Sequence, residues 1–254
     1  MILKIKHFVV FITIGYLLSC GDKVSELSAV AGERIVLDSA YSESDSIDAF
    51  VAPYRKRVNE ILDSTLAYAP EVISKSDGKY NTSAGNLMAD IVLSEANPIF
   101  KSRTGKEIDF VLLNHGGIRS QISKGKITAR TAYEVMPFEN TIVVAELSGK
   151  SVRELVSFLK NSGRPHPITG LEIMLNTDDT VASIQIQGKP LDEKRAYHVG
   201  TSNYLVTGGD QMGFFKDAKN VVDTDYLIRN AMIDYFKKVD TLSAAVDKRF
   251  VKLE

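Results

Sequence analysis

The sequence predicts a mixed α/β fold, on three observations. Segments with apolar residues at helical spacing recur along the chain, and so do β-branched or continuous apolar segments of strand length. The two kinds do not alternate strictly, which favours an α+β or mixed α/β arrangement. The part from about residue 46 to residue 254 has the length of one domain and can bury a substantial core.

Several segments have the apolar spacing of amphipathic helices. The first begins at Ser46 and tolerates Pro53 because that proline falls in its early turns. Thr128 can cap a short helix, and Ser148-Gly149 opens another. The predicted helices are 46–62, Gly85–Ala96, Thr128–Glu134, Ser148–Leu159 and Asp223–Lys237.

The predicted strands are rich in β-branched and aliphatic residues. Asp109–Leu113 is a continuous apolar run that ends in a tight loop, as buried strands do. Asp178-Asp179 forms a turn between two later strands. The predicted strands are a short one at Val72-Ile73, then Asp109–Leu113, Thr141–Leu147, Leu171–Leu175, Ala182–Ile186, Tyr197–Thr201 and Arg249–Leu253.

The first nineteen residues have the pattern of an export signal. Lys4 and Lys6 precede the apolar run Phe8–Leu18, which is shorter than the ~20 residues that span a membrane. The run ends at Cys20, the single cysteine of the chain, in a sequence similar to the lipobox of bacterial lipoproteins. The alternative is cleavage elsewhere, with Cys20 incidental.

We therefore expect a signal peptide over 1–19 and a lipidated tether over 20–45, rich in Ser, Asp, Glu and Gly. Lipid at Cys20 would anchor the protein outside the cytoplasm, on the periplasmic or cell-surface face. Loss of the leader changes the net charge from −1 to −3, because it removes two lysines and no acids. A charge so nearly balanced gives no sign of a nucleic-acid partner.

Three polar loops could carry chemistry. Asn81–Asn86 precedes a helix, where backbone N–H groups favour anions, but ordinary helix capping is the favoured explanation. Asn114–Arg119 and Asn203–Asp210 each follow a predicted strand and contain a glycine pair. Their glycines can serve a plain turn or let the backbone approach a ligand. Phe138 and Tyr204 could hold a flat ring between them, or Phe138 could be a core residue.

Three segments, in this order, resemble the C-terminal, nucleotide-recognising domain of the 5′-nucleotidase family, which includes UDP-sugar hydrolases and 2′,3′-cyclic phosphodiesterases. They are Gly85–Asp90, Asn114–Arg119 and Asn203–Asp210. The stretch from Ile127 through Pro137–Asn140 to Lys150 is similar too, so the likeness spans roughly residues 68–238. It implies a 5′-nucleotidase C-terminal fold over 46–254, with sheets packed between helices.

The resemblance also implies the residues that contact a nucleotide or nucleoside. Phe138 and Tyr204 match the two stacking rings, and Asp210 matches the carboxylate that bonds the ribose. Gly208, with its neighbour Gly209, shapes the third loop. The implied substrate-binding residues are Asn114, Arg119, Phe138, Tyr204, Gly208 and Asp210.

Two positions depart from the family pattern. The first loop commonly carries an arginine near Ser83 or Asn86, and this chain has none there, which puts affinity or substrate choice in doubt. Family members usually have glycine at His115. His115 is either a new polar contact or a tolerated loop substitution.

In the family, hydrolysis belongs to a separate N-terminal domain that holds two metal ions. The four histidines of this chain, His7, His115, His166 and His198, lie on separate segments, without the motifs of such a site. The mature chain also has no room for a metallophosphatase domain ahead of residue 46. We therefore expect no cofactor and no catalytic residue in this chain, and divalent metal ions in a partner chain.

Three hypotheses follow. In the first, this chain recognises the nucleotide and a separate metallophosphatase chain performs hydrolysis. In the second, it is a non-catalytic nucleotide-binding surface lipoprotein. In the third, it is an interaction domain that has lost nucleotide recognition, which the missing arginine favours and the retention of Asn114, Arg119, Phe138 and Asp210 disfavours.

Overall fold

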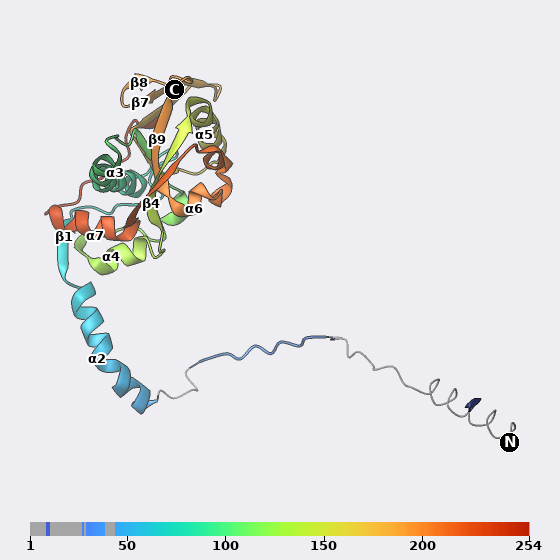
Figure 1. Cartoon of the computed structure of the whole chain (residues 1–254). Coiled ribbons are helices and arrows are strands. Elements are labelled where there is room, and N and C mark those ends of the chain that lie inside the picture. Colours follow the sequence, from blue (N-terminus) through green and yellow to red (C-terminus); the bar gives the residue numbers. More distant parts are fainter. Residues whose placement is uncertain (1–8, 11–26, 28, 39–43, 254) are drawn as a thin grey trace. The chain divides into compact units, whose positions relative to one another are not determined.

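The computed structural model describes residues 9–10, 27, 29–38 and 44–253 (Figure 1). The chain divides into two units, Met1–Phe50 and Val51–Glu254. In the first unit, residues 29–38 have no helix or strand. Cys20 and most of the predicted signal peptide and tether lie outside the described residues. No helix among the described residues has the length and apolar character needed to cross a membrane.

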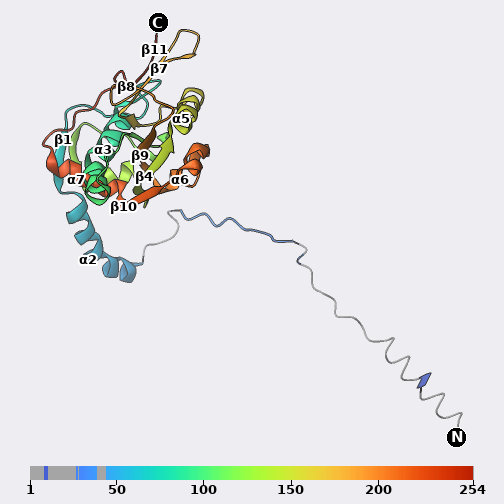
Figure 2. The same cartoon turned by 45° about the horizontal axis from the view of Figure 1, so that its top comes forward.

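A mixed five-stranded sheet forms the centre of the second unit, in the order β10-β4-β9-β2-β5 (Figure 2). The short strand β2 runs parallel to β9, and the other pairs are antiparallel. β4 and β9 pair along nearly their whole lengths. The strands are β2 (Phe110–Leu112), β4 (Thr141–Ser148), β5 (Ile168–Thr169), β9 (Ala196–Ser202) and β10 (Val221–Leu227).

Two smaller sheets complete the β structure. One has the order β11-β6-β7-β8, and the other is the antiparallel pair β1-β3. Asp179, in the turn between β6 and β7, has a φ of 65°, as the predicted turn at Asp178-Asp179 requires. These strands are β1 (Thr65–Ala69), β3 (Gly125–Thr128), β6 (Leu171–Leu175), β7 (Val181–Ile186), β8 (Lys189–Pro190) and β11 (Phe250–Lys252).

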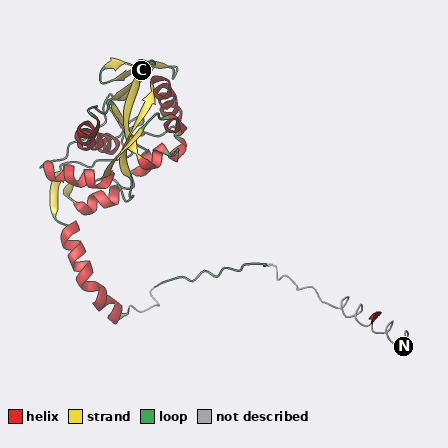
Figure 3. Cartoon of the chain, in the orientation of Figure 1, coloured by secondary structure: helices red, strands yellow, loops and turns green. Residues whose placement is uncertain are grey.

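Helices cover both faces of the central sheet (Figure 3). Because side chains alternate along a strand, Phe110 and Leu112 of β2 enter the core on the side of α5, whereas Val111 and Leu113 enter the core of α3, α4 and α7. The predicted fold, with sheets packed between helices, is therefore confirmed. The helices with buried residues are α3 (Ser83–Thr104), α4 (Ala129–Val135), α5 (Gly149–Asn161), α6 (Asn203–Val206) and α7 (Ile228–Lys238). The helix α2 (Asp45–Leu62) has no buried residue and does not cover the sheet.

Polar side chains start these helices where the sequence indicates. The hydroxyl of Thr82 accepts from the N–H of Gly85, and the hydroxyl of Ser148 accepts from the N–H of Ser151. Thr128 caps α4 with a reciprocal contact to Thr131. α3 continues through Pro98 and ends at Gly105, whose φ of 72° closes the helix. It is therefore longer than the predicted Gly85–Ala96.

The helix predicted over Asp223–Lys237 is wrong in its first third. Val221–Leu227 forms strand β10, and α7 starts at Ile228. Val222 and Thr224 are β-branched and favour a strand, and β4 offers Val222 an antiparallel partner. Strand pairing with a distant segment overrides the local helical spacing.

Further differences concern short strands. β5 and β8, of two residues each, were not predicted. β1 and β3 were not predicted either, and each is stabilised by the other across about sixty residues of chain. The strand predicted at Val72-Ile73 is a single bridge between Ile73 and Ile122. The pair β1-β3 and this bridge depend on partners that are remote in the sequence.

The start of α5 leaves no room for a side chain at Gly149. A Cβ there would lie 2.5 Å from the Cα of Glu193 and would also overlap the carbonyl of Asp192. We predict that Gly149→Ala lowers the free energy of unfolding by about 1–3 kcal/mol, as overpacking does. Urea denaturation measures it. Gly213→Ala, with open space around its Cβ, is the control and should stay within about 0.5 kcal/mol. Equal effects of the two changes would contradict the steric argument.

Candidate functional site

Strand order brings four loops to one edge of the central sheet. β2 and β9 are parallel neighbours, so the segments that follow them, from Asn114 and from Asn203, leave from the same edge. β4 is antiparallel to β9 and pairs Ile142 with Ser202, so the loop before β4 reaches that edge. β5 is antiparallel to β2, so the loop before β5 reaches it as well.

A cavity of about 420 Å³ lies where these loops meet. It brings together five of the six residues implied for nucleotide contact: Asn114, Arg119, Phe138, Tyr204 and Asp210. Its volume falls within the range of small-molecule sites. Four residues that the sequence did not single out as contacts also line the cavity: Gly116, Gly117, Asn140 and Arg164.

Asp210 is the centre of a hydrogen-bond network in the cavity. Its Oδ2 accepts from the Nδ2 of Asn114 at 2.7 Å, and its Oδ1 accepts from the hydroxyl of Tyr204 at 3.0 Å. Asp210 itself has a φ of 49°, a conformation that Asp tolerates better than most residues. The network joins the loop after β2 to the loop after β9 and holds the carboxylate in a defined orientation.

Gly208 does not line the cavity but determines the path of its loop. Its φ of 90° lies in the left-handed region, and a Cβ there would overlap the side chain of Lys216. At Gly209 a Cβ would lie 2.5 Å from Cζ of Tyr204. The glycine pair therefore lets the tyrosine ring fold back over the loop toward Asp210.

The two aromatic residues are partly exposed, 40% for Phe138 and 43% for Tyr204, so neither is buried in the core. The guanidinium of Arg119 lies over the ring of Phe138, 5.9 Å from its centroid, and donates to the carbonyl of Gly116 at 3.3 Å. Phe138 is therefore a surface residue of the cavity and not a core residue.

His166 holds the loop after β2 in place through a hydrogen bond with the backbone of His115. Its Nδ1 accepts from the N–H of His115 at 3.2 Å, and its side chain is buried. Burial lowers the pKa of His166 to about 4, helped by His115 and Arg164 and opposed by Asp210. Burial and the charge of Lys75 also lower the pKa of His115. Both imidazoles are neutral at pH 7, and His115 is not among the cavity-lining residues.

The first loop, Asn81–Asn86, has a structural role. Asn81 Nδ2 donates to the carbonyls of Asp247 and Phe250, and Asn86 Nδ2 donates to Asn81 and to the carbonyl of Ala245. These asparagines are buried and fasten the C-terminal segment to α3. The capping explanation of this loop is therefore confirmed, and the loop does not line the cavity.

His198 lies away from the cavity, between Asp109 and Glu146, at 3.6 Å and 3.8 Å. Burial and the charge of Lys106 lower its pKa in spite of these two carboxylates. In the part of the chain that the structure describes, no group of three or more His, Cys, Asp or Glu residues could hold a metal ion.

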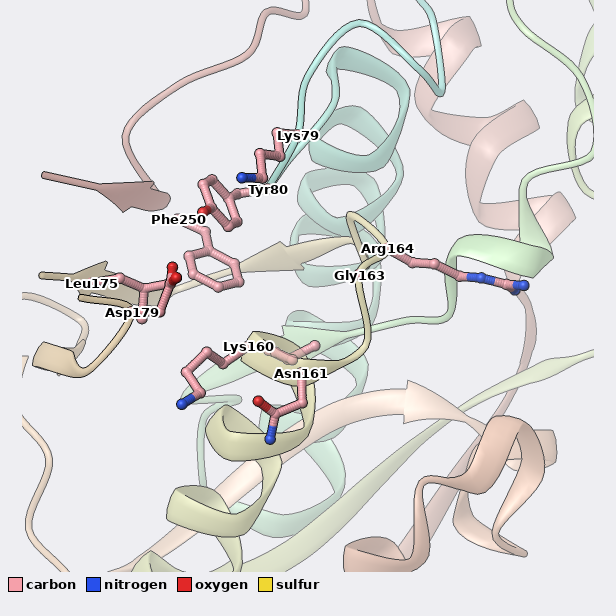
Figure 4. A pocket seen from close by; sticks show the side chains of 10 residues that line it. Lys79, Tyr80, Lys160, Asn161, Gly163, Arg164, Leu175, Asp179 and Phe250 are labelled. Atoms are coloured by element: carbon pink, nitrogen blue, oxygen red, sulfur yellow. The ribbon is translucent and has the colours of Figure 1, made fainter. Parts of the chain in front are cut away.

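A second pocket, of about 370 Å³, lies on the other side of the loop between α5 and β5 (Figure 4). Its lining includes Lys79, Tyr80, Lys160 and Phe250. Arg164 belongs to both pockets, but its side chain leaves the loop on the side away from Lys160 (Figure 4). None of the residues implied for nucleotide contact lines this second pocket.

Of the cavity residues without a predicted contact role, Asn140 and the two glycines lie inside the segments that carry the family resemblance. Arg164 does not belong to any such motif. Its place depends on the pairing of β5 with β2, and β5 is two residues long, too short to give a periodic signal.

The buried neutral imidazole of His166 makes stability depend on pH. Between pH 6.5 and 4 the unfolded chain binds a proton that the folded chain excludes, so stability is full above pH 6.5 and falls toward pH 4. We predict that this group alone accounts for a loss of about 2 kcal/mol between pH 7 and pH 5. The variant His166→Asn keeps an acceptor near the position of Nδ1 but does not titrate. Its loss of unfolding free energy between pH 7 and pH 5 should therefore be smaller than that of the parent protein by about 2 kcal/mol.

Urea unfolding of both proteins at pH 7 and pH 5 measures the difference. His198 lies away from this pair and titrates in both proteins, so its contribution cancels in the comparison. Equal losses in the two proteins would show that His166 is not the group responsible.

Comparisons with known proteins show the family of the domain. The family described as 5′-nucleotidase, C-terminal domain, matches residues 64–217. Protein UshA of Yersinia enterocolitica is 24% identical over 217 residues, covering 84% of this chain and 38% of that protein. Cell wall protein Lmo0130 of Listeria monocytogenes is 28% identical over 197 residues, covering 70% and 25%.

Among solved structures, the 5′-nucleotidase precursor of Thermus thermophilus has a TM-score of 0.67 and 27% identity. The match covers 82% of this chain and 43% of that one. The chain thus spans less than half the length of these relatives. By the family match over most of its folded part, the chain belongs to the 5′-nucleotidase C-terminal domain family.

Proposed function

We propose that this chain recognises the nucleotide for a 5′-nucleotidase-type phosphohydrolase, and that a separate metallophosphatase chain performs the hydrolysis. The observation that carries the proposal is the cavity itself. Two half-exposed rings, a carboxylate, a carboxamide and a guanidinium come from three separate loops and meet in one site. Each of these groups suits one part of a nucleotide.

The base would stack between Phe138 and Tyr204. Asp210 would accept hydrogen bonds from the two ribose hydroxyls, since each of its oxygens keeps a free lone pair beside the contact it already makes. Asn140 follows Phe138 by two residues and lines the same cavity, so its amide can donate to or accept from the edge of the base. Arg119 supplies positive charge for the phosphate.

The metal ions that activate water and hold the phosphate oxygens would belong to the partner chain. The similarity to longer nucleotidases supports this division, because the matched part of each relative leaves more than half of its length for other domains. The residues of this chain would bind and orient the nucleotide and leave its phosphate accessible.

We place the protein outside the cytoplasm, anchored through lipid at Cys20. The export-signal pattern of the first nineteen residues supports this location. So do two of the relatives, one named a cell wall protein and the other a 5′-nucleotidase precursor.

A second candidate function is nucleotide binding without any catalytic partner. The observation in its favour is the network of Asn114, Asp210 and Tyr204, which is complete in the chain alone. A site organised before the ligand arrives loses less conformational entropy on binding.

Both functions predict that the two rings carry binding of AMP. Phe138→Ala and Tyr204→Ala should each weaken binding by about 1–3 kcal/mol in calorimetry, because each removes a stacking face. Tyr204→Phe keeps the ring and should weaken binding less. Tyr68→Ala removes a tyrosine of similar exposure, 45%, from outside the cavity and should leave the affinity unchanged. An equal loss with Tyr68→Ala would rule out the assigned stacking site.

The split-enzyme proposal predicts a gain of activity on pairing. Co-expression of the full chain with exported metallophosphatase chains should yield one pair that releases phosphate from AMP faster than either chain alone. Phe138→Ala in this chain should reduce the gain, and a chelator should abolish it, because the metal ions are in the partner. If no pairing raises phosphate release while the chain still binds AMP, the binding-only function holds instead.

A further inference from the structure

The arginines of the folded unit divide into two groups. Between residues 100 and 253, all of which the structure describes, there are eight arginines. Six form an ion pair with a carboxylate: Arg103, Arg130, Arg153, Arg195, Arg229 and Arg249. The two that have no carboxylate partner within this described stretch are Arg119 and Arg164, and both line the 420 Å³ cavity.

We propose that Arg164 is a specificity-determining residue, which binds the phosphate of the nucleotide together with Arg119 and selects nucleotides over nucleosides. This inference rests on the proposed function of the cavity. It concerns a residue that lies outside the motifs shared with the family and comes from a different loop, between α5 and β5.

The backbone of Arg164 is fixed on both sides, so its side chain has a defined starting point. The hydroxyl of Ser162 accepts from the Arg164 N–H at 3.3 Å, and the N–H of His166 donates to the Arg164 carbonyl at 3.0 Å. Further along, the carbonyl of Pro167 accepts from the N–H of Leu113, directly before the loop that carries Asn114. The loop of Arg164 is therefore fastened to the loop that contains Arg119.

The direction of the side chain agrees with this placement. Lys160 and Asn161 face the second pocket, whereas the guanidinium of Arg164 extends away from them (Figure 4). Arg164 is thus the member of this loop that supplies charge to the nucleotide cavity.

The charge balance of the cavity favours an anionic ligand. Its lining holds two guanidiniums and one carboxylate, and both oxygens of that carboxylate, on Asp210, already accept hydrogen bonds. Neither guanidinium is neutralised by an ion pair among the described residues. A phosphate oxygen pair matches the fork of an arginine, and the doubly charged monoester can engage two of them.

Calorimetry on the full chain with AMP and with adenosine tests the inference. Arg164→Gln should weaken AMP binding about tenfold and change adenosine binding less than about twofold, because only AMP carries the charged group. Arg164→Lys, which keeps the charge but loses the fork, should give an intermediate affinity for AMP. The urea midpoint of each variant should match the parent protein, since the guanidinium makes no ion pair with the described residues that folding requires.

Lys160→Gln is the matched control. It removes one positive charge four residues away, from the second pocket, and should change AMP binding less than about threefold. An equal loss in Lys160→Gln would show a general field effect and overturn direct contact. An equal loss for AMP and adenosine in Arg164→Gln would show that Arg164 contacts the nucleoside part, and no loss for either would show that it contacts neither compound.

The parent protein separates the two proposals. If it binds neither compound, the proposed function fails. If it binds both and Arg164→Gln weakens the two equally or not at all, this inference alone fails.

Discussion

The parallel pairing of β2 with β9 is the constraint on which the rest of the site depends. The pairing is short, Phe110 with Val199 and Val111 with Gly200, yet it fixes the direction of two chain segments that are about ninety residues apart. A Cβ at Gly200 would lie 2.9 Å from the side chain of Val111, so glycine leaves room for that side chain. With β2 and β9 parallel, antiparallel β4 and β5 on their outer sides must begin where β2 and β9 end. Strand direction therefore brings the loops of the site together, and their side chains then form the cavity.

The hydrogen bonds at that edge serve both the fold and the site. Asp210 connects two loops through Asn114 and Tyr204, and His166 holds the first of these loops through the N–H of His115. A carboxylate in such a network keeps its orientation without a ligand, which reduces the entropy lost on binding. The same arrangement requires His166 to stay neutral, because its Nδ1 acts as an acceptor, so the integrity of the edge is linked to pH.

Much of this organisation could be predicted from the sequence, and the exceptions share one physical cause. Local signals were sufficient for α5, for the strands β4, β6 and β9, and for the caps at Thr128 and Ser148. The loops after β2 and β9 were found because their glycine and asparagine residues stand at the ends of apolar runs. Local signals failed where a remote partner decides the structure, as in β1 with β3 and in β10, whose Val222 pairs with Val144.

Arg164 shows the same limit for the site. Nothing in Gly163-Arg164-Pro165 marks a ligand contact, and the residue reaches the cavity because a two-residue strand places its loop beside β2. The missing arginine of the first loop was recognised from the family pattern. That loop fastens the C-terminal segment to α3, so its side chains have structural partners in this chain.

The glycines of the site determine which of its positions can vary. Gly209 is closed to a side chain, because a Cβ there would overlap the ring and the carbonyl of Tyr204. A Cβ at Gly116 would make only ordinary contacts with Asn114 and Asp210, at 3.4 Å and 3.5 Å. A change at Gly209 would therefore displace the ring of Tyr204. Asn140 and Arg164 have no such backbone restriction, and both line the cavity. A designed library that aims to alter ligand preference would therefore vary these two positions and keep Gly209.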